Sequence, residues 1–514
     1  MSQQGSVSLR VETTSGWVEG TREGTVSFFR GIPYAAAPIG ELRFAAPQAV
    51  APWAGTRLAQ DYAAIAPQIR RSDGVFDGGD DCLNLNVWTP STEDSYRPVL
   101  VWIPGGGFHM GEGSDVRYDG TQLATRGDVV VVTLNYRLGA MGFLYLGGIA
   151  DEVPWSANAG LLDQVAALEW VRDNIAAFGG DPGRVTIFGE SAGGMAVVDL
   201  MAMPKALGLF HGVIAQSGAG DDVASVDEAS EMTGRVLDSL GIAAGEAHKI
   251  STVPTNDLLA AQQQCQSLYL AKRWGLSIRP VIDGTVMPTH PRVSIAEGRA
   301  ANVPLLVGTN LDEWRAFADP ASFELDETSL RVRLHEALGV HAEEVLSAYR
   351  ACRPESSPSD LWFAIESDRN FRVPAIWLAE VQRRCQERTF SYLFTWPSVV
   401  KQLGSCHAID VPFVFGTLDK PGMPELAGDS ATAWELSSKV QDAWLAFAKT
   451  GNPSADSLPA WSSYDASRRA TMIFDDPCNA ADAPFDAERL VWESLPLRPL
   501  SLSTKALNDE IASR

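Results

Sequence analysis

The chain has 514 residues, of which 45% are hydrophobic and 20% charged, a balance typical of a globular protein and unlike a disordered chain or fibrous repeat. Its 64 acidic and 41 basic residues give a formal charge of −23 without a basic stripe, so nucleic acid is not an expected partner. The sequence shows no signal-peptide core, no apolar run of membrane-spanning length and no C-x-x-C pair among its six cysteines. We therefore expect a cytoplasmic protein with reduced thiols and no membrane span.

The first half of the chain alternates expected strands and helices. Residues 99–103 and 129–134 are continuous apolar runs, the pattern of strands covered on both faces in a parallel sheet. Residues 161–178 have apolar side chains at helical spacing and end at a Gly-Gly-Asp-Pro stop signal. A strand at 185–188, a helix that runs to Pro204 and a strand at 212–218 follow. This order predicts an α/β fold.

The second half is less regular. Further strands are expected at 303–310 and 390–396, and an amphipathic helix from residue 434 that Gly451 and Pro453 close. No internal repeat or flexible linker interrupts the chain. We expect a single elaborated domain over 1–514, with a body at about 7–220, 300–318 and 388–498 and helical insertions at about 221–299 and 319–387.

One serine lies between glycines where a strand becomes a helix. Residues 188–194 read "FGESAGG", which contains a G-x-S-x-G pattern centred on Ser191. In this pattern a sharp strand-to-helix turn exposes the serine oxygen, and glycine on either side removes Cβ atoms that would clash. The helix N-terminus also offers unpaired N–H groups to an oxyanion. The alternative is a chance match in a glycine-rich chain, but the flanking strand and helix favour a nucleophile.

A second glycine-rich turn follows the strand at 99–103. The three glycines of "IPGGGF" let the backbone approach a reacting carbonyl, so the N–H groups of Gly106 and Gly107, with that of Ala192, are candidates for an oxyanion hole. A dinucleotide-binding loop is the competing interpretation. It requires a glycine at position 110, which is Met110.

A serine nucleophile needs a base and an acid that orients the base. Six histidines follow Ser191, and the residues alone do not select among them: His211, His248, His290, His335, His341 and His407. For the acid, Asp312 and Glu313 are adjacent after the expected strand at 303–310. Adjacent residues of an extended chain point to opposite sides, so only one of the two carboxylates can face the base.

The sequence resembles the type B carboxylesterases, the group of α/β hydrolases that includes cholinesterases and bacterial para-nitrobenzyl esterases. The resemblance covers nearly the whole chain and rests on motifs in the family's order: "FRGIPYAAAPIGELRF" (29–44), "DDCLNLNVWTP" (80–90), "NYRLGAMGFL" (135–144), "NAGLLDQVAALEWVRDNIAAFGGDPGRVTIFGESAGG" (158–194), "QSGA" (216–219), "FVFG" (413–416) and "AFAKTGNP" (446–453).

The resemblance implies an α/β-hydrolase fold, with a central mostly parallel sheet, flanking helices and a large helical insertion over the active site. It also implies a Ser191, Glu313 and His407 triad in the usual chain order, an oxyanion hole at Gly106, Gly107 and Ala192, and no metal or cofactor. The expected function is hydrolysis of small to medium hydrophobic carboxylic esters. Hydrolysis of carbamates or amides by the same triad, or a non-catalytic binding role, are the alternatives, and monomer and homodimer both remain open.

Three departures from the family pattern stand out. No cysteine precedes Cys82, so the disulfide that closes a loop in animal relatives cannot form. No tryptophan lies between Gln68 and Asp81, so the platform that cholinesterases use for quaternary ammonium is absent, and choline esters are not expected substrates. Trp314 replaces the glycine that usually follows the acid, which changes the surroundings of Glu313.

Overall fold

The computed structural model describes residues 7–70, 74–93, 96–219, 222–270, 276–493 and 495. The chain divides into two compact units, one made of Met1–Ile214 and Gly220–Pro291 and the other of Ala215–Ala219 and Arg292–Arg514. The single-domain organisation and its boundaries, parts of which lie outside the described residues, stay a prediction.

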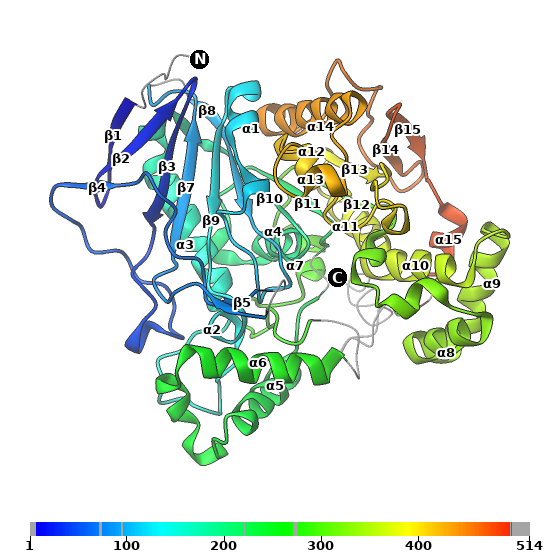
Figure 1. Cartoon of the computed structure of the whole chain (residues 1–514), viewed down its shortest axis with the longest axis horizontal. Coiled ribbons are helices and arrows are strands. Elements are labelled where there is room, and N and C mark those ends of the chain that lie inside the picture. Colours follow the sequence, from blue (N-terminus) through cyan, green and yellow to red (C-terminus); the bar gives the residue numbers. More distant parts are fainter. Residues whose placement is uncertain are drawn as a thin grey trace. The chain divides into compact units, whose positions relative to one another are not determined.

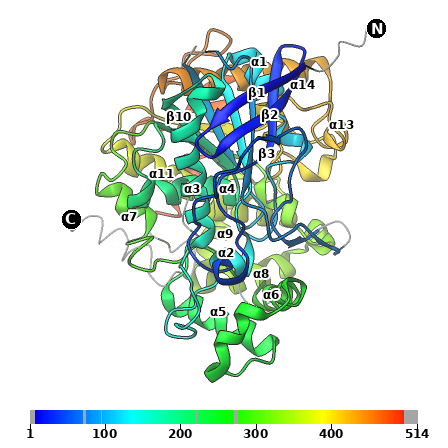
Figure 2. The same ribbon diagram turned by 90° about the vertical axis from the view of Figure 1, so that its left-hand side faces the viewer.

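The first unit contains a mixed sheet whose strands follow the order β1-β2-β3-β7-β9-β8-β10, with β4 beside β2. The strands are β1 (Val7–Thr13), β2 (Gly16–Glu23), β3 (Val26–Pro33), β4 (Thr56–Leu58), β7 (Asn84–Thr89), β8 (Arg97–Ile103), β9 (Val130–Leu134) and β10 (Gly180–Glu190); β5 (Gln68–Ile69) and β6 (Phe76–Asp77) form a separate hairpin. From β1 to β9 the neighbours on the main path are antiparallel, whereas β9, β8 and β10 are parallel. Figure 2 shows β1 and β2 as long blue arrows beside β3.

Six helices of this unit lie among the described residues. They are α1 (Thr121–Gly127), α2 (Gly139–Phe143), α3 (Ala159–Asn174), α4 (Ala192–Ala202), α5 (Val226–Ser239) and α6 (Thr255–Leu270). Helix α5 begins at a capping box formed by Ser225 and Glu228. Helices α3 and α4 pack on β10, and α5 packs beside α6, as Figure 1 shows. The expected helix at 161–178 is α3 followed by a 3-10 turn, and α4 starts directly after Ser191.

The second unit contains the strands β12 (Leu305–Asn310), β13 (Thr389–Phe394), β14 (Ala470–Phe474) and β15 (Asn479–Asp482) in that spatial order. The first three are parallel, and β15 is antiparallel to β14. Its helices are α8 (Glu327–Leu338), α9 (Ala342–Cys352), α10 (Pro358–Ser367), α11 (Val373–Arg383), α12 (Val411–Phe415), α13 (Met423–Leu426), α14 (Ala431–Thr450) and α15 (Asp486–Leu490). Strand β11 (Gly212–Gln216) and helix α7 (Pro291–Ala296) run across the division between the units.

Burial confirms why the central strands are apolar throughout. Every residue of β9 and every residue of β8 after Arg97 is buried, so these strands have no face for polar side chains. The α/β order that the sequence predicts is therefore confirmed. The N-terminal strands β1 to β3 were not predicted. In β1 and β2 partly exposed residues alternate with buried ones, and in β3 the partly exposed Arg30 and Gly31 interrupt the buried residues.

Two further findings concern partners and covalent links. None of the helices among the described residues combines the length and apolar character that a bilayer span requires. All six cysteines, which lie within the described ranges, are free thiols.

Candidate active site

Ser191 lies in a strained turn between β10 and α4. Its φ of 58° and ψ of −125° are unusual for a residue with a side chain, and its carbonyl accepts the N–H of Met195 at 2.8 Å. A Cβ atom on Gly189 would lie 2.5 Å from the carbonyl carbon of Gly193, and one on Gly193 would lie 2.0 Å from the oxygen of Ile103. Both glycines are therefore required by close backbone approach, as the G-x-S-x-G pattern predicts.

The triglycine loop packs directly against this turn. Because β8 and β10 are parallel neighbours with Ile103 opposite Gly189, the segments that follow them leave the sheet side by side. A Cβ atom on Gly105 would lie 2.4 Å from the oxygen of Glu190 and 3.2 Å from the Cβ of Ser191. The fold thus brings the predicted oxyanion loop into contact with the predicted nucleophile.

Backbone planarity fixes the direction of a candidate donor in this loop. The carbonyl of Gly106 faces into a tight turn, where it accepts the N–H groups of His109 at 3.2 Å and Met110 at 3.0 Å. In a trans peptide the N–H points opposite to the C=O, so the Gly107 N–H points out of that turn. Ala192 is the first residue of α4, where an N–H has no acceptor within the helix.

Glu313 and His407 form a buried pair in the second unit. The Glu313 Oε2 lies 2.5 Å from His407 Nδ1, and the two side chains are 0% and 9% exposed. The other carboxylate oxygen accepts the hydroxyl of Ser217 at 2.5 Å and the N–H of Asn310 at 2.7 Å. Because the carboxylate accepts at Nδ1, that nitrogen carries a proton, and Nε2 is the nitrogen available as a base.

Asp312, the alternative acid, has a different role. Its carboxylate accepts the N–H of Ser405 at 3.0 Å and the Nε–H of Arg315 at 3.2 Å, and its own N–H donates to the Ser405 carbonyl at 2.8 Å. These bonds tie the loop that carries His407 to the end of β12. The structure therefore brings Glu313, not Asp312, to His407.

A second buried carboxylate lies behind this pair. Asp410 accepts hydrogen bonds from Gln216 at 2.8 Å, from Tyr392 at 3.2 Å and from Asn310 at 3.3 Å. Burial raises the pKa of Asp410, and the nearby Glu313 raises it further, against the opposite effect of the Gln216 hydrogen bond. This carboxylate completes a polar layer that connects β11, β12 and the loop of His407.

Two phenyl rings pack against the imidazole of His407. The ring centroids of Phe317 and Phe371 lie 4.8 and 5.0 Å from that of the imidazole, and the two phenyl rings are nearly parallel to each other. The Trp314 ring packs against both phenyl rings, and the backbone N–H of Trp314 donates to Ser367 Oγ at 2.9 Å. The residue that replaces the family's glycine therefore supports the rings beside the base.

Phe371 is presented by the π-helical turn η9 (Asp368–Arg372), which joins α10 to α11. Buried ion pairs hold this turn: Arg372 binds both oxygens of Asp368 at 2.6 Å, and Arg369 lies 3.0 Å from Glu366. Such turns often occur at functional sites. The sequence analysis did not predict this turn. Charged residues three and four positions apart inside an otherwise apolar helix are a signal that could have indicated it.

The residues that the sequence singled out fall in both units. Ser191, Gly106, Gly107 and Ala192 belong to the first, and Glu313 and His407 to the second. Ser217 and Asn310, which hold the Glu313 carboxylate, were not assigned a role from the sequence. The "QSGA" motif contained Ser217, but its contact with a residue 96 positions later depends on the fold.

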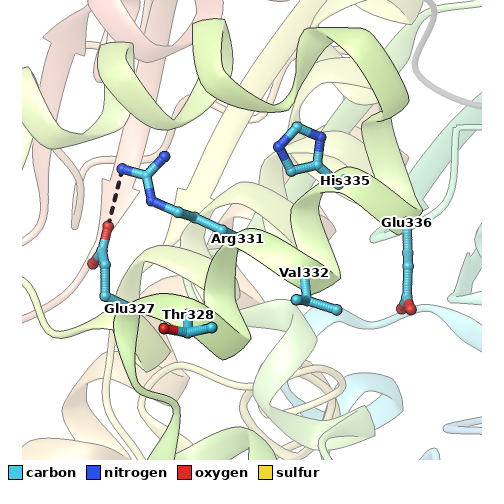
Figure 3. Close-up of a pocket in the computed structure, with 6 residues that line it drawn as sticks. All are labelled: Glu327, Thr328, Arg331, Val332, His335 and Glu336. Atoms are coloured by element: carbon cyan, nitrogen blue, oxygen red, sulfur yellow. Dashed lines mark ion pairs between the residues drawn. The ribbon is translucent and has the colours of Figure 1, made fainter.

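An open hollow of about 580 Å³ lies elsewhere, along one face of α8, and Figure 3 shows the six residues that line it. They include Arg331, which forms an ion pair with Glu327 at 3.3 Å, and His335. All six belong to a single helix, so the hollow is a surface groove. It contains none of the predicted catalytic residues.

Comparison with known proteins places the chain in a family. Residues 7–492 match the model of the carboxylesterase family. The chain is 40% identical over 490 residues to the para-nitrobenzyl esterase of Bacillus subtilis, which covers 93% of this chain and 97% of that protein. It is 35% identical over 483 residues to the phenmedipham hydrolase of Pseudarthrobacter oxydans, with 90% and 94% covered.

Solved structures agree with these sequence matches. The carboxylesterase of Geobacillus stearothermophilus is 38% identical, with a TM-score of 0.86 and coverage of 94% of this chain and 100% of that one. A para-nitrobenzyl esterase structure gives a TM-score of 0.82 at 38% identity, with 94% and 99% covered. The predicted α/β-hydrolase fold is thereby confirmed. The chain belongs to the carboxylesterase family and is an enzyme of its serine-dependent carboxylic ester hydrolase class.

Proposed function

We propose that Ser191, His407 and Glu313 act as a catalytic triad that hydrolyses small to medium hydrophobic esters through an acyl-enzyme. The observation that carries this proposal is the buried Glu313–His407 pair, in which one carboxylate oxygen holds Nδ1–H and the other is held by two donors. A carboxylate fixed in this way stabilises the imidazolium that forms when the base takes a proton. The strained, partly exposed Ser191 supplies the nucleophile.

The reaction proceeds in two halves. His407 Nε2 takes the hydroxyl proton of Ser191 as Oγ attacks the ester carbonyl, and the N–H groups of Gly106, Gly107 and Ala192 receive the oxyanion. The C–O bond to the alcohol then breaks, and the imidazolium returns its proton to the leaving oxygen. Water repeats the sequence on the acyl-enzyme, which releases the acid and restores the hydroxyl. One oxyanion donor typically contributes ~3 kcal/mol to lowering the barrier.

The surroundings of the base favour apolar substrates. Phe317 is 42% exposed and lies beside His407, so it offers an apolar surface near the group that protonates the leaving alcohol. The names of the two relatives, a para-nitrobenzyl esterase and a phenmedipham hydrolase, are consistent with substrates that contain apolar groups. Hydrolysis of carbamates and amides would use the same triad and oxyanion hole. The test therefore also measures the rates for these two substrate classes.

The experiment compares Ser191→Ala with Ser329→Ala, a substitution of an exposed serine on α8. Hydrolysis of para-nitrophenyl acetate should vanish in the first variant and be unchanged in the second. A fluorinated organophosphate should add one phosphoryl group per chain to the wild type, with loss of fluoride, and none at position 191 in Ser191→Ala. A Ser191→Ala protein with wild-type activity would overturn the triad. Rates across matched esters, carbamates and amides then define the bond that is cleaved.

We also propose that the enzyme works in the cytoplasm. Its support is the set of six free cysteines, including the exposed Cys352, because exposed thiols persist in a reducing compartment. Cell fractionation followed by an esterase assay tests this location, and recovery of the activity outside the cytoplasmic fraction would contradict it.

A further inference from the structure

The carbonyl groups of the triglycine loop are held by partners in the first unit. Pro104 O accepts the hydroxyl of Tyr136 at 3.0 Å, and Phe108 O accepts the N–H of Gly139 at 2.6 Å. Gly107 O lies 2.9 Å from His109 Nδ1, so this loop carbonyl is held by the side chain of a residue two positions further along the chain.

The held carbonyl belongs to a strained part of the loop. Gly107 and Phe108 have φ values of 64° and 60°, and Phe108 is a bulky residue for which the left-handed region costs roughly 1–2 kcal/mol. The Gly107 carbonyl and the Phe108 N–H share one rigid peptide plane, so a bond to this carbonyl fixes the rotation on both sides of it. The Phe108 ring, 5.1 Å from that of Phe143, anchors the other end of the strained turn.

The chemistry of the bond determines the state of the histidine. A carbonyl oxygen only accepts, so Nδ1 carries the proton in this contact. Protonation of the second ring nitrogen leaves that donor in place. The bond is therefore compatible with both the neutral and the protonated ring.

We propose that His109 is a positioning residue of the oxyanion hole. Its Nδ1–H holds the Gly107 carbonyl and keeps Phe108 in the left-handed conformation, and so limits rotation about Gly107, which with Gly106 carries proposed oxyanion donors. The inference rests on the proposed function, since it assumes that the oxyanion forms at this loop. It assigns a task to a histidine that lies outside the Ser191, Glu313 and His407 set.

Three substitutions separate the two ring nitrogens. His109→Asn places an amide N–H close to the position of Nδ1, His109→Gln extends the amide toward the position of Nε2, and His109→Leu removes the donor. We expect His109→Asn to keep kcat within about threefold of the wild type. The other two should lose about 10–100-fold in kcat with little change in KM, less than the ~10²–10³-fold cost of removing an oxyanion donor itself.

The inhibition constant of a trifluoromethyl ketone directly measures how well the oxyanion hole binds an anion. Ser191 Oγ adds to its carbonyl carbon, the serine proton passes to His407, and the ketone oxygen becomes the anion that the loop must hold. Its inhibition constant should rise about 10–100-fold in His109→Gln and His109→Leu and stay within about threefold in His109→Asn. Urea unfolding of each variant shows that the comparison is made on folded protein, and the Gln variant keeps a polar side chain should the Leu variant be unstable.

The outcomes distinguish the two proposals. A wild type that binds the ketone tightly, together with a Leu or Gln variant that binds it equally well, overturns the role of His109 and leaves the triad intact. An Asn variant as impaired as the Leu variant also overturns it, because the restored donor should rescue the site. A wild type that neither hydrolyses esters nor binds the ketone overturns the proposed function and this inference with it.

Discussion

Replacing Glu313 by Gln tests the geometry of the buried pair. The substitution preserves shape but turns one carboxylate oxygen into an NH₂ group, and the structure offers that group no good place. If the NH₂ replaces Oε1, it faces the N–H of Asn310, which cannot accept a hydrogen bond. If it replaces Oε2, it faces His407 Nδ1 and forces the proton onto Nε2, the nitrogen that takes the proton of Ser191 in the proposed mechanism.

The expected loss of kcat follows from which of the two orientations the amide adopts. A buried N–H left facing another donor costs about 1–3 kcal/mol, which favours the second orientation and hence the wrong tautomer. An amide in place of the triad acid lowers kcat about 10⁴-fold in a well-known serine protease. We expect Glu313→Gln to lower kcat about 10³–10⁴-fold, equivalent to about 4–5.5 kcal/mol of barrier.

The assay measures kcat and KM for para-nitrophenyl butyrate beside Asp312→Asn as the matched control. Asn at 312 still offers an oxygen to the N–H of Ser405, and the acceptor that faces His407 Nδ1 is Glu313, which this variant keeps. We expect that variant to lose at most about tenfold in kcat and about 1 kcal/mol of unfolding free energy. Equal losses of kcat in the two variants, or a Glu313→Gln enzyme close to the wild type, would refute the reasoning.

Three more outcomes are expected. Ser217→Ala removes a hydroxyl that holds the Glu313 carboxylate, so kcat should fall about tenfold at constant KM, and unchanged steady-state kinetics would count against it. Trp314→Gly removes the support of two phenyl rings, so urea unfolding should show a loss of about 3 kcal/mol, and full stability would contradict that support. Burial raises the pKa of Asp410, so its contribution to stability is present below the ordinary carboxyl range and is lost as pH rises through the raised value. The unfolding free energy of wild type minus that of Asp410→Asn should therefore fall as the pH rises above the ordinary carboxyl pKa of about 4, and a rise would contradict the sign.

The sequence predicted best the elements whose pattern is local. The runs at 99–103 and 129–134 became β8 and β9 because buried parallel strands have no polar face. The same reasoning passed over β1, which pairs with β2 at the end of the sheet order, and over β2, although each has side chains partly in water. Pattern reasoning that starts from continuous apolar runs misses such half-exposed strands, although their alternation carries a usable signal.

The residues of the candidate site also divide into those that the local sequence identifies and those that only the fold brings together. The glycines around Ser191 and in the triglycine loop were identifiable because a close backbone approach permits only one residue type. Selecting His407 among six histidines required the family resemblance, since a base is defined by what lies near it in space. Ser217 was not identified at all, because its bond to Glu313 spans 96 positions of the chain.

The wide turn of helix at Asp368–Arg372 has a consequence for insertions and deletions. An α-helix advances by 100° per residue, so deleting one residue there would tighten the turn to ordinary geometry and rotate one flanking helix relative to the other by about that angle. The ring of Phe371 would then move away from the imidazole of His407. The ion pair between Asp368 and Arg372, which are four residues apart, would be broken. A single-codon loss in this segment should therefore be far more damaging than the replacement of any one of its side chains.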